Sequence, residues 1–351
     1  MLKACDVALW DRYDLAILDL DGVVYVGPDA VTGAAGHLER AAAAGMHLAY
    51  VTNNAARTPD MVAAHLRELG VPAKVEDVVT SAQAAARLVA AAVPTGSNVF
   101  VIGGQGLVDA LAEHGLTSVQ DITDDPAAVV SGYHPDLRWR TVIDGAILVR
   151  QGLPWVASNA DLTIPTEHGI GPGNGVLVRA VADFAGREPD VAGKPQPPLF
   201  EETRLRVGGR RPLVVGDRLD TDIEGAVNAG LDSLLVFTGV TGVAELVRAD
   251  QRHRPTYICT DLAGLGKPQT VPDVGPDGVH SLGGWTAAVK DGDLMVDGSG
   301  DADDWWRIVA TAGWGHLDTA GEPVDTAHLS PPGSVTPDRT TADHTARDGD
   351  T

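Results

Sequence analysis

The stretch that decides the fold is Leu15-Ala16-Ile17-Leu18-Asp19-Leu20-Asp21-Gly22-Val23. Its first four residues form a continuous apolar run, which is typical of a parallel strand buried on both faces. Catalytic and ligand-binding residues of open α/β sheets gather beyond the carboxyl ends of the strands. Asp19 and Asp21 lie at such an end, and Gly22 lets the chain turn there. A plain polar strand end in a chain rich in Asp and Gly would fit the same motif, so the prediction of a site needs support from other segments.

Strands and helices alternate on both sides of this stretch. Apolar patterns predict helices over 34–44 and 60–69 around a strand over 47–51, and a similar rhythm restarts near residue 213. This alternation predicts an α/β fold with a Rossmann-like parallel sheet. The segment between the two halves has strand–helix units of its own and predicts an inserted α/β cap domain. The predicted catalytic core is therefore 1–81 plus 190–268, and the predicted cap is 82–189.

The composition changes after about residue 268. Rough alternation over 285–296 around Asp291-Gly292 predicts a β-hairpin, and the pattern over 302–312 predicts a helix. We therefore expect a small α+β extension over 269–317. Residues 318–351 are mostly Thr, Asp, Pro and Gly with few apolar side chains, which predicts a disordered tail.

Three further motifs lie at or near predicted strand ends. The hydroxyl and main-chain N–H groups of Thr52-Asn53-Asn54 could hold phosphate oxygens, although such a segment more often only starts a loop. Lys194, between Gly193 and Pro195, could neutralise a phosphate and a nucleophilic aspartate together. Taken alone, this motif would favour a solvated surface lysine. The third motif is Gly216-Asp217-Arg218-Leu219-Asp220-Thr221-Asp222, which follows an apolar strand and opens a helix.

The two Asp-rich motifs do not match an EF-hand calcium loop. The first lacks the glycine that such a loop has at its sixth position, and the second has Leu231 where the loop needs a bidentate glutamate. Taken together, the four motifs bring several carboxylates to one edge of the sheet. A divalent cation would offset their repulsion, and oxygen ligands favour Mg²⁺ over zinc.

This set of motifs resembles the haloacid dehalogenase superfamily of phosphatases. The long insert is similar to the large α/β cap of the phosphoglycolate, pyridoxal-phosphate and nitrophenyl phosphatases. With its C-terminal extension the chain most resembles the actinobacterial glycerol 3-phosphate phosphatases, whose extension is acetyltransferase-like. This chain has no acetyl-CoA signature, so we expect no acetyl transfer from it.

The resemblance implies a role for each motif residue. Asp19 would be the nucleophile, and Asp21 the general acid and base. Mg²⁺ would bind to Asp19, to Asp217 and to the main-chain carbonyl of Asp21, with Asp222 in support. The phosphate group would be held by Gly22, Thr52, Asn53, Asn54 and Lys194. An aspartate at position 21 argues against a dehalogenase.

The cap is expected to exclude water and to choose the substrate. Asn159, Asp161 and Asn174 lie near predicted cap turns and are candidates for substrate contacts, although a purely structural loop is at least as good an interpretation. Gly104-Gln105-Gly106 follows a predicted strand, as in a dinucleotide-binding fingerprint. Asp109 stands where the third glycine would be, so we interpret this segment as a cap turn.

Composition limits the partners and the location of the chain. Its 351 residues carry a formal net charge of −22, so we expect neither nucleic-acid nor membrane partners. Cys5 and Cys259 lie far apart and predict no disulfide framework. The chain shows no signal-peptide core and no apolar run of membrane-spanning length, so we expect a cytoplasmic protein. Capped relatives often dimerise through the cap, which makes a homodimer a further expectation.

The predicted function is Mg²⁺-dependent hydrolysis of a small phosphomonoester, glycerol 3-phosphate or phosphoglycolate, through an aspartyl-phosphate intermediate. An alternative is a nucleotide or pyridoxal-phosphate phosphatase, which the low aromatic content of 5% disfavours. A non-catalytic phosphate-binding or scaffold protein is the second alternative. It would have no need for a nucleophile and an acid together.

Overall fold

The computed structural model describes residues 2–166 and 168–333, and its centre is a six-stranded parallel sheet. The strand order β15-β14-β13-β1-β4-β5 places β1 in the middle. The α/β fold with a parallel core is thereby confirmed. The strands are β1 (Leu15–Leu18), β4 (His47–Thr52), β5 (Val78–Thr80), β13 (Pro212–Gly216), β14 (Asp232–Val236) and β15 (Tyr257–Cys259).

Side chains of β1 point alternately into two hydrophobic clusters, one on each face of the sheet. Ala16 and Leu18 pack in a cluster with α2 (Ala34–Ala43) and α3 (Pro59–Glu68). Leu15 and Ile17 pack on the other face, in a cluster with α4 (Ser81–Ala92) and α8 (Pro198–Val207). Burial on both faces is the reason why this strand has no polar residue before Asp19.

The inserted cap is a second parallel sheet with the order β12-β9-β8-β6-β7. Asp190 pairs with Val156 in this sheet, so residues 190–191 belong to the cap sheet and not, as predicted, to the core. The remaining domain boundaries stay a proposal. The cap strands are β6 (Asn98–Ile102), β7 (Thr117–Val119), β8 (Ala128–Ser131), β9 (Trp155–Ala157), β12 (Asp190–Val191) and the hairpin β10 (Thr163–Thr166) with β11 (Gly169–Pro172); its helices are α5 (Gln105–Glu113), α6 (Trp139–Arg150) and α7 (Asn174–Ala185).

The cap packs tightly against the core where α5 begins. A Cβ atom on Gly106 would lie 2.3 Å from the main-chain oxygen of Ala55. The glycine that resembled part of a dinucleotide fingerprint is therefore needed for this close approach of cap and core. The helix α4 contacts α8 of the core as well as α5 of the cap, and its hydrophobic cluster is continuous across both domains.

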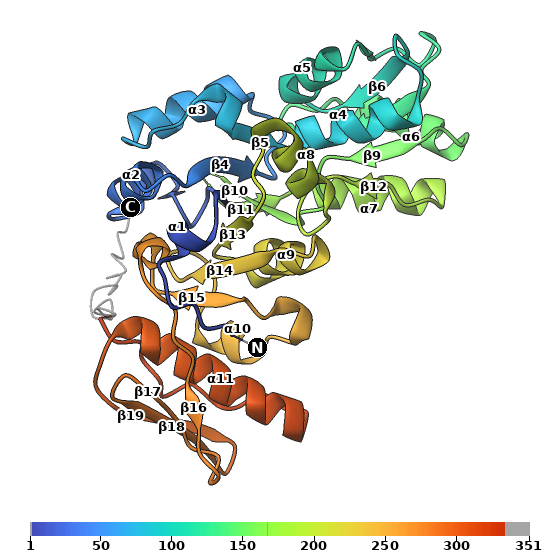
Figure 1. Cartoon of the computed structure of the whole chain (residues 1–351). Helices are drawn as coiled ribbons and strands as arrows, with labels where there is room; N and C mark the ends of the chain where they lie inside the picture. The colour runs from blue at the N-terminus through green and yellow to red at the C-terminus, as the bar shows by residue number, and fades with distance from the viewer. Residues whose placement is uncertain (1, 167, 334–351) are drawn as a thin grey trace, which may run out of the picture.

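The extension is a four-stranded antiparallel sheet, β16-β17-β18-β19, covered by the long helix α11 (Ala302–Ala320). Asp291 and Gly292 have positive φ angles at the turn between β18 and β19, as the hairpin motif predicts. The helix α11 lies between the extension sheet and the core elements α10 and β15, so the core separates the cap from the extension (Figure 1). The remaining elements here are β16 (Asp273–Val274), β17 (His280–Leu282), β18 (Trp285–Lys290), β19 (Asp293–Gly298) and α10 (Val243–Val247).

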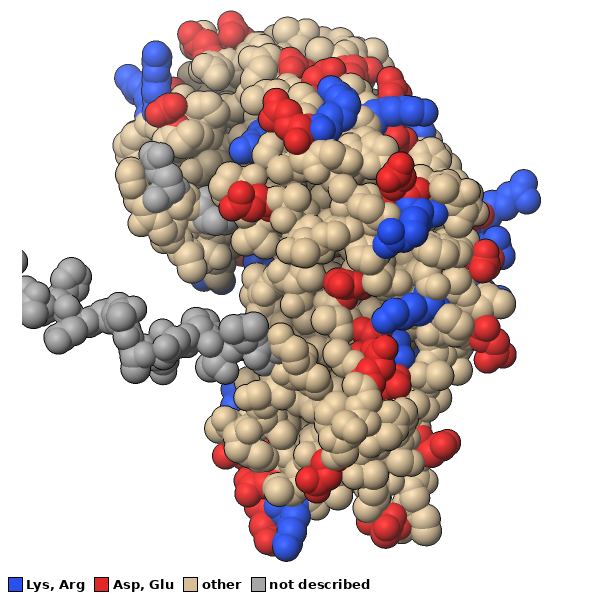
Figure 2. Space-filling model, turned by 90° about the vertical axis from the view of Figure 1, so that its left-hand side faces the viewer, with Lys and Arg blue, Asp and Glu red and all other residues tan. Residues whose placement is uncertain are grey.

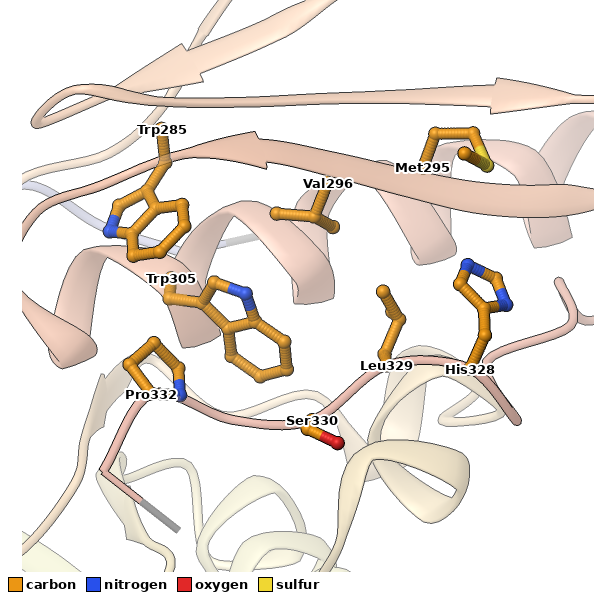
Figure 3. A pocket seen from close by; sticks show the side chains of 8 residues that line it. All are labelled: Trp285, Met295, Val296, Trp305, His328, Leu329, Ser330 and Pro332. Atoms are coloured by element: carbon orange, nitrogen blue, oxygen red, sulfur yellow. The ribbon is translucent and has the colours of Figure 1, made fainter.

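The predicted start of disorder at residue 318 is wrong. The helix α11 continues to Ala320, Val324 is buried, and the main-chain oxygen of Asp325 accepts from the N–H of Leu294 in β19. A few apolar residues were enough to hold this segment on the sheet, although its composition had predicted no ordered structure there. Residues 334–351 of the predicted tail lie outside the described residues. The returning segment closes a pocket of about 350 Å³ (Figure 3), lined by Trp285, Met295, Val296, Trp305, His328, Leu329, Ser330 and Pro332.

Within residues 2–166 and 168–333, no helix combines the length and the apolar character that a membrane span requires. Figure 2 shows one face of the molecule, on which acidic and basic side chains are interspersed. Cys5 and Cys259 are both buried and free, in line with the absence of a predicted disulfide framework.

Candidate active site

The parallel sheet brings three of the predicted motifs to one edge. Asp19 follows β1, Thr52 ends β4, and Asp217 follows β13. Since β1 pairs in parallel with both neighbours, their carboxyl ends coincide. The main-chain N–H of Asp19 donates to the main-chain oxygen of Val215 at 2.9 Å, so the hydrogen bonding between β1 and β13 extends to Asp19.

Lys194 links the two halves of the core sequence. Its side chain is buried, and its Nζ atom donates to Asp19 Oδ1 at 2.6 Å and to Asp222 Oδ1 at 2.7 Å. Burial alone would lower the pKa of Lys194, but the negative charges of Asp19 and Asp222 outweigh it and raise that pKa above its usual value. The ammonium group is therefore charged at neutral pH. Gly193 permits this placement, since a Cβ atom there would lie 2.6 Å from Asn53 Oδ1.

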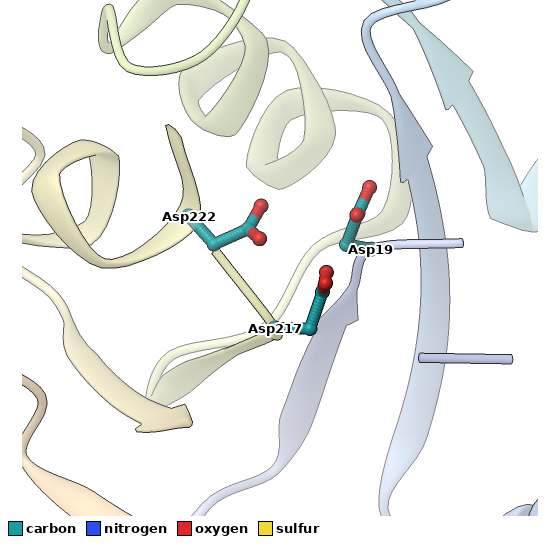
Figure 4. A group of neighbouring side chains, drawn as sticks. All are labelled: Asp19, Asp217 and Asp222. Carbon is teal, nitrogen blue, oxygen red and sulfur yellow. The ribbon is translucent and has the colours of Figure 1, made fainter. Parts of the chain in front are cut away.

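Three carboxylates converge beside Lys194. Oxygen atoms of Asp19, Asp217 and Asp222 lie within 4.8 Å of one another, and the three side chains point into a common space (Figure 4). Burial, with the charges of Asp222 and Asp19, raises the pKa of Asp217 to about 7. Burial also raises the pKa of Asp222, while Lys194 opposes that shift. So much negative charge in a buried place calls for a cation besides Lys194.

The Asp217 side chain fits a metal ligand. Its Oδ2 atom accepts from the main-chain N–H of Val240 at 2.7 Å. Its Oδ1 atom is buried and has no hydrogen-bond partner among the described residues. An unpaired buried carboxylate oxygen beside two further carboxylates suits a hard cation such as Mg²⁺. Asp222, predicted only in support, belongs to this cluster, whereas the side chain of Asp21 does not.

Asp21 is exposed, unlike the buried Asp217 and Asp222. Loss of surrounding water and the charge of Asp19 raise the pKa of Asp21 to about 6, against the opposing charges of Lys194 and Arg57. A carboxyl group with a pKa near neutrality can both give and take a proton, as general acid–base catalysis requires. The sequence motifs did not include Arg57, which comes five residues after Thr52.

Gly22 and the loop 238–241 both lie against the side chain of Asp217. Gly22 has a φ of +83°, and a Cβ atom on it would lie 2.5 Å from Asp217 Oδ2. The loop is also tied to Gly22, since Thr238 Oγ1 donates to the main-chain oxygen of Gly22 at 2.5 Å. Sequence reasoning missed this loop. Its position directly after the strand β14, at the same edge of the sheet, was the available signal.

The motif Thr52-Asn53-Asn54 is largely occupied by its own hydrogen bonds. Thr52 Oγ1 accepts from the main-chain N–H of Asn54 at 3.0 Å, and Asn54 Oδ1 accepts from Ala56 at 2.9 Å. The Asn53 side chain accepts from the main-chain N–H of Lys194 at 2.8 Å. These bonds set the shape of the loop beside Asp19, while its predicted contact with phosphate stays a prediction.

The cap candidates form a chain of hydrogen bonds to the core. Asn174 Nδ2 donates to the main-chain oxygen of Asn159 at 2.7 Å, and Asn159 Nδ2 donates to that of Asn53 at 2.6 Å. Both side chains are buried. Asp161 is half-buried and accepts from Asn53. The structure thus places these residues at the junction of cap and core, and their contact with substrate stays a prediction.

Comparison with known proteins accounts for this arrangement. A haloacid dehalogenase-like hydrolase model matches residues 16–117, and a HAD-hydrolase-like model matches residues 191–265. The chain is 44% identical to the D-glycerol 3-phosphate phosphatase of Mycobacterium tuberculosis over 86% of each chain. The chain belongs to the haloacid dehalogenase-like hydrolase family. Within that family it is a phosphatase of the nitrophenyl phosphatase type, as the motifs predicted.

Solved structures of the family agree with this assignment. The glycerol phosphate phosphatase of Mycobacterium tuberculosis, crystallised with magnesium, superposes with a TM-score of 0.81 at 41% identity, covering 91% of this chain and 94% of that one. The p-nitrophenyl phosphatase of Archaeoglobus fulgidus gives a TM-score of 0.67 at 28% identity, covering 72% and 98%. The acid sugar phosphatase of Staphylococcus haemolyticus is 36% identical over 72% of this chain and 94% of its own.

Proposed function

We propose that this family member hydrolyses a small phosphomonoester, glycerol 3-phosphate first of all, with Asp19 as nucleophile and Mg²⁺ as its metal ion. The observation that carries the proposal is the buried ammonium group of Lys194, which bridges Asp19 and Asp222. It neutralises the place where a phosphoryl group would meet Asp19. A phosphate-binding scaffold would have no use for a carboxylate at that place.

The residues divide the work of the reaction. Lys194 holds Asp19 through Oδ1, and no described residue donates to Asp19 Oδ2, which is free to attack. Mg²⁺ held by Asp19, Asp217 and the main-chain carbonyl of Asp21, with Asp222 in support, would offset the charge of the phosphoryl group. Lys194 adds a fixed positive charge to the same place.

The chemical steps follow from these positions. Asp19 Oδ2 forms a bond to phosphorus while the bond between phosphorus and the alcohol oxygen breaks. Asp21 gives its proton to that oxygen, because an alkoxide is a poor leaving group. Asp21, now a carboxylate, then takes a proton from the water that attacks the phosphoaspartate. The bond between phosphorus and Asp19 breaks, and inorganic phosphate leaves.

The substrate proposal draws support from the relatives. The 44% identical relative is named for D-glycerol 3-phosphate, and its similarity spans 86% of each chain. Asp161 is the cap candidate that is not fully buried. Burial raises its pKa, and the positive charges of Lys194 and Arg218 act against that shift. We assign it to the hydroxyl groups of a small polyol phosphate. Phosphoglycolate and pyridoxal phosphate are the competing substrates.

Phosphate release tests the proposal. Wild type and Asp19→Asn are compared with and without Mg²⁺ on D-glycerol 3-phosphate, its L enantiomer, phosphoglycolate, a sugar phosphate, pyridoxal phosphate and a nucleoside monophosphate. Turnover by wild type alone, only with Mg²⁺, and with the highest kcat/KM on glycerol 3-phosphate supports it. A higher kcat/KM on pyridoxal phosphate or a nucleotide would contradict the proposed substrate. Equal turnover by Asp19→Asn would contradict the role of Asp19 as nucleophile.

A homodimer through the cap is part of the same proposal. Trp139 on α6 is 68% exposed and Phe184 on α7 is 49% exposed. Large exposed apolar side chains on two cap helices are a suitable surface for a second copy. Light scattering of wild type and Trp139→Asp tests it: a dimer that dissociates in the variant supports the cap interface, and a monomeric wild type contradicts it.

A further inference from the structure

The C-terminal extension reaches the loop that holds Asp217. Trp306 on α11 stacks on Phe237, with ring centroids 3.5 Å apart and ring planes at 9°. Trp306 is buried. Phe237 is the first residue after β14, and the loop 238–241 follows it directly. The aromatic stack therefore fixes the point where this loop leaves the sheet.

The loop 238–241 contacts the site through main-chain and side-chain groups. Val240 N–H donates to Asp217 Oδ2 at 2.7 Å, and Thr241 Oγ1 donates to the main-chain oxygen of Asp217. A Cβ atom on Gly239 would lie 2.0 Å from Asp217 Oδ2, so the loop lies directly against the carboxylate. By occupying Oδ2, the loop determines the direction in which Oδ1 points.

A second contact joins the extension to the site. Ile223, which follows Asp222, is buried in the same hydrophobic cluster as Trp306 and Phe237. Asp222 is thus followed by a residue that packs with the extension, and Asp217 contacts a loop that begins at such a residue. The extension lies on the side of the core away from the cap (Figure 1).

We propose that Trp306 is a positioning residue for the metal site, acting through Phe237 and the loop 238–241 on Asp217. The inference rests on the proposed Mg²⁺ site. Loss of a group that directly orients a metal ligand typically weakens metal binding 10- to 100-fold. Trp306 acts through one further contact, so we expect its loss to raise the Kd for Mg²⁺ by roughly 3- to 10-fold.

The experiment compares three variants of the full chain by calorimetric titration with Mg²⁺ alone. Trp306→Leu removes the stack, and Trp306→Phe keeps a ring to stack on Phe237. Trp314→Leu is the matched control, since Trp314 is equally buried on α11 but donates to Leu246 of α10. We expect weaker Mg²⁺ binding in Trp306→Leu, near wild-type binding in Trp306→Phe, and lower thermal stability with an unchanged Kd in Trp314→Leu.

Two results would overturn the inference. One is a wild-type Kd in Trp306→Leu; the other is an equal loss of affinity in Trp314→Leu, which would reduce the effect to general destabilisation. Asp217→Asn separates the two proposals: if it binds Mg²⁺ as wild type does, the metal site itself is wrong. Should Trp306→Leu not fold, Phe237→Leu removes the same stack from the core side and gives the same readout.

Discussion

The side-chain amide of Asn53 in the core donates to both carboxylate oxygens of Asp161 in the cap, at 3.2 and 3.1 Å. The same amide also donates to the main-chain oxygen of Lys194 at 3.0 Å. One side chain therefore connects the cap with the segment that carries the central lysine. The position of the cap and the position of Lys194 depend on each other through Asn53.

Replacing Asn53 by Asp tests this connection. The change removes the donor and places a second carboxylate against Asp161, so we expect a loss of about 1–3 kcal/mol in the free energy of unfolding. Urea denaturation measures it. Asn54→Asp is the control, because a carboxylate oxygen can still accept from Ala56, and its effect should be small. Adding Asp161→Asn to Asn53→Asp should restore most of the loss, and a failure to restore any would contradict the pairwise account.

Replacing Lys194 by Met removes the cation between Asp19 and Asp222. We expect kcat to fall by roughly 10²- to 10³-fold, as for other fixed groups that stabilise charge in the transition state. Steady-state phosphate release at saturating Mg²⁺ measures the effect. Lys194→Arg should not restore activity, because a planar guanidinium cannot replace a compact ammonium in a buried site. Wild-type turnover by the Arg variant would show that only the charge is needed.

Replacing Gly22 by Ala combines backbone strain with a clash. The residue has a φ of +83°, and the new Cβ atom would lie 2.5 Å from Asp217 Oδ2. Gly27→Ala is the control, since Gly27 also has a positive φ but no atom of the described part of the chain lies within 4 Å of its added Cβ. Both variants should lose about 1–2 kcal/mol through the backbone conformation. Only Gly22→Ala should also bind Mg²⁺ more weakly in a calorimetric titration, and equal Mg²⁺ affinities would argue against the clash.

Asp303 predicts a pH dependence of stability. Burial acts to raise its pKa, but hydrogen bonds from Lys267 and Thr260 outweigh burial and hold the pKa of Asp303 below its usual value. The contribution of a carboxyl with a lowered pKa is complete above its unfolded pKa of about 3.9 and is lost as the pH falls through the folded pKa. The extension should therefore loosen from the core in acid.

The variant Asp303→Asn measures this contribution. At pH 6 to 7 we expect it to be less stable than wild type by about 1–2 kcal/mol, because charged hydrogen bonds to Lys267 and Thr260 are lost. The loss is no larger because Lys267 is partly exposed and solvent screens its charge. The difference should shrink as the pH falls below the unfolded pKa of about 3.9 and through the lower pKa that Asp303 has in the folded protein. Asp273→Asn, at an exposed strand residue of the same extension, is the control. A difference that stays constant from pH 7 down to pH 3 would show that the charge of Asp303 plays no part.

The tail shows where sequence reasoning failed, and the cap shows what it left open. Asn159 and Asn174 were candidates for substrate contacts because they lie near cap turns; the structure adds that Asn159 bonds to Asn53 of the core and Asn174 to Asn159, and their contact with substrate stays a prediction. Turn chemistry gives a loop its local shape but says nothing of which domain covers it. The predicted disorder from residue 318 failed for a similar reason, since one buried residue such as Val324 changes little in the composition.

The sequence by itself determined the core fold and the place of Asp19 at the end of its central strand. A strand buried on both faces must be apolar up to the point where it leaves the sheet, so the position of Asp19 can be read from the chain. Only the tertiary structure decided that Lys194 would lie between Asp19 and Asp222 and that Asp217 Oδ1 would have no hydrogen-bond partner among residues 2–166 and 168–333. The stacking of Trp306 on Phe237 was likewise decided only by the tertiary structure. These contacts join segments far apart in the chain, and such contacts depend on how whole layers pack, which no local pattern records.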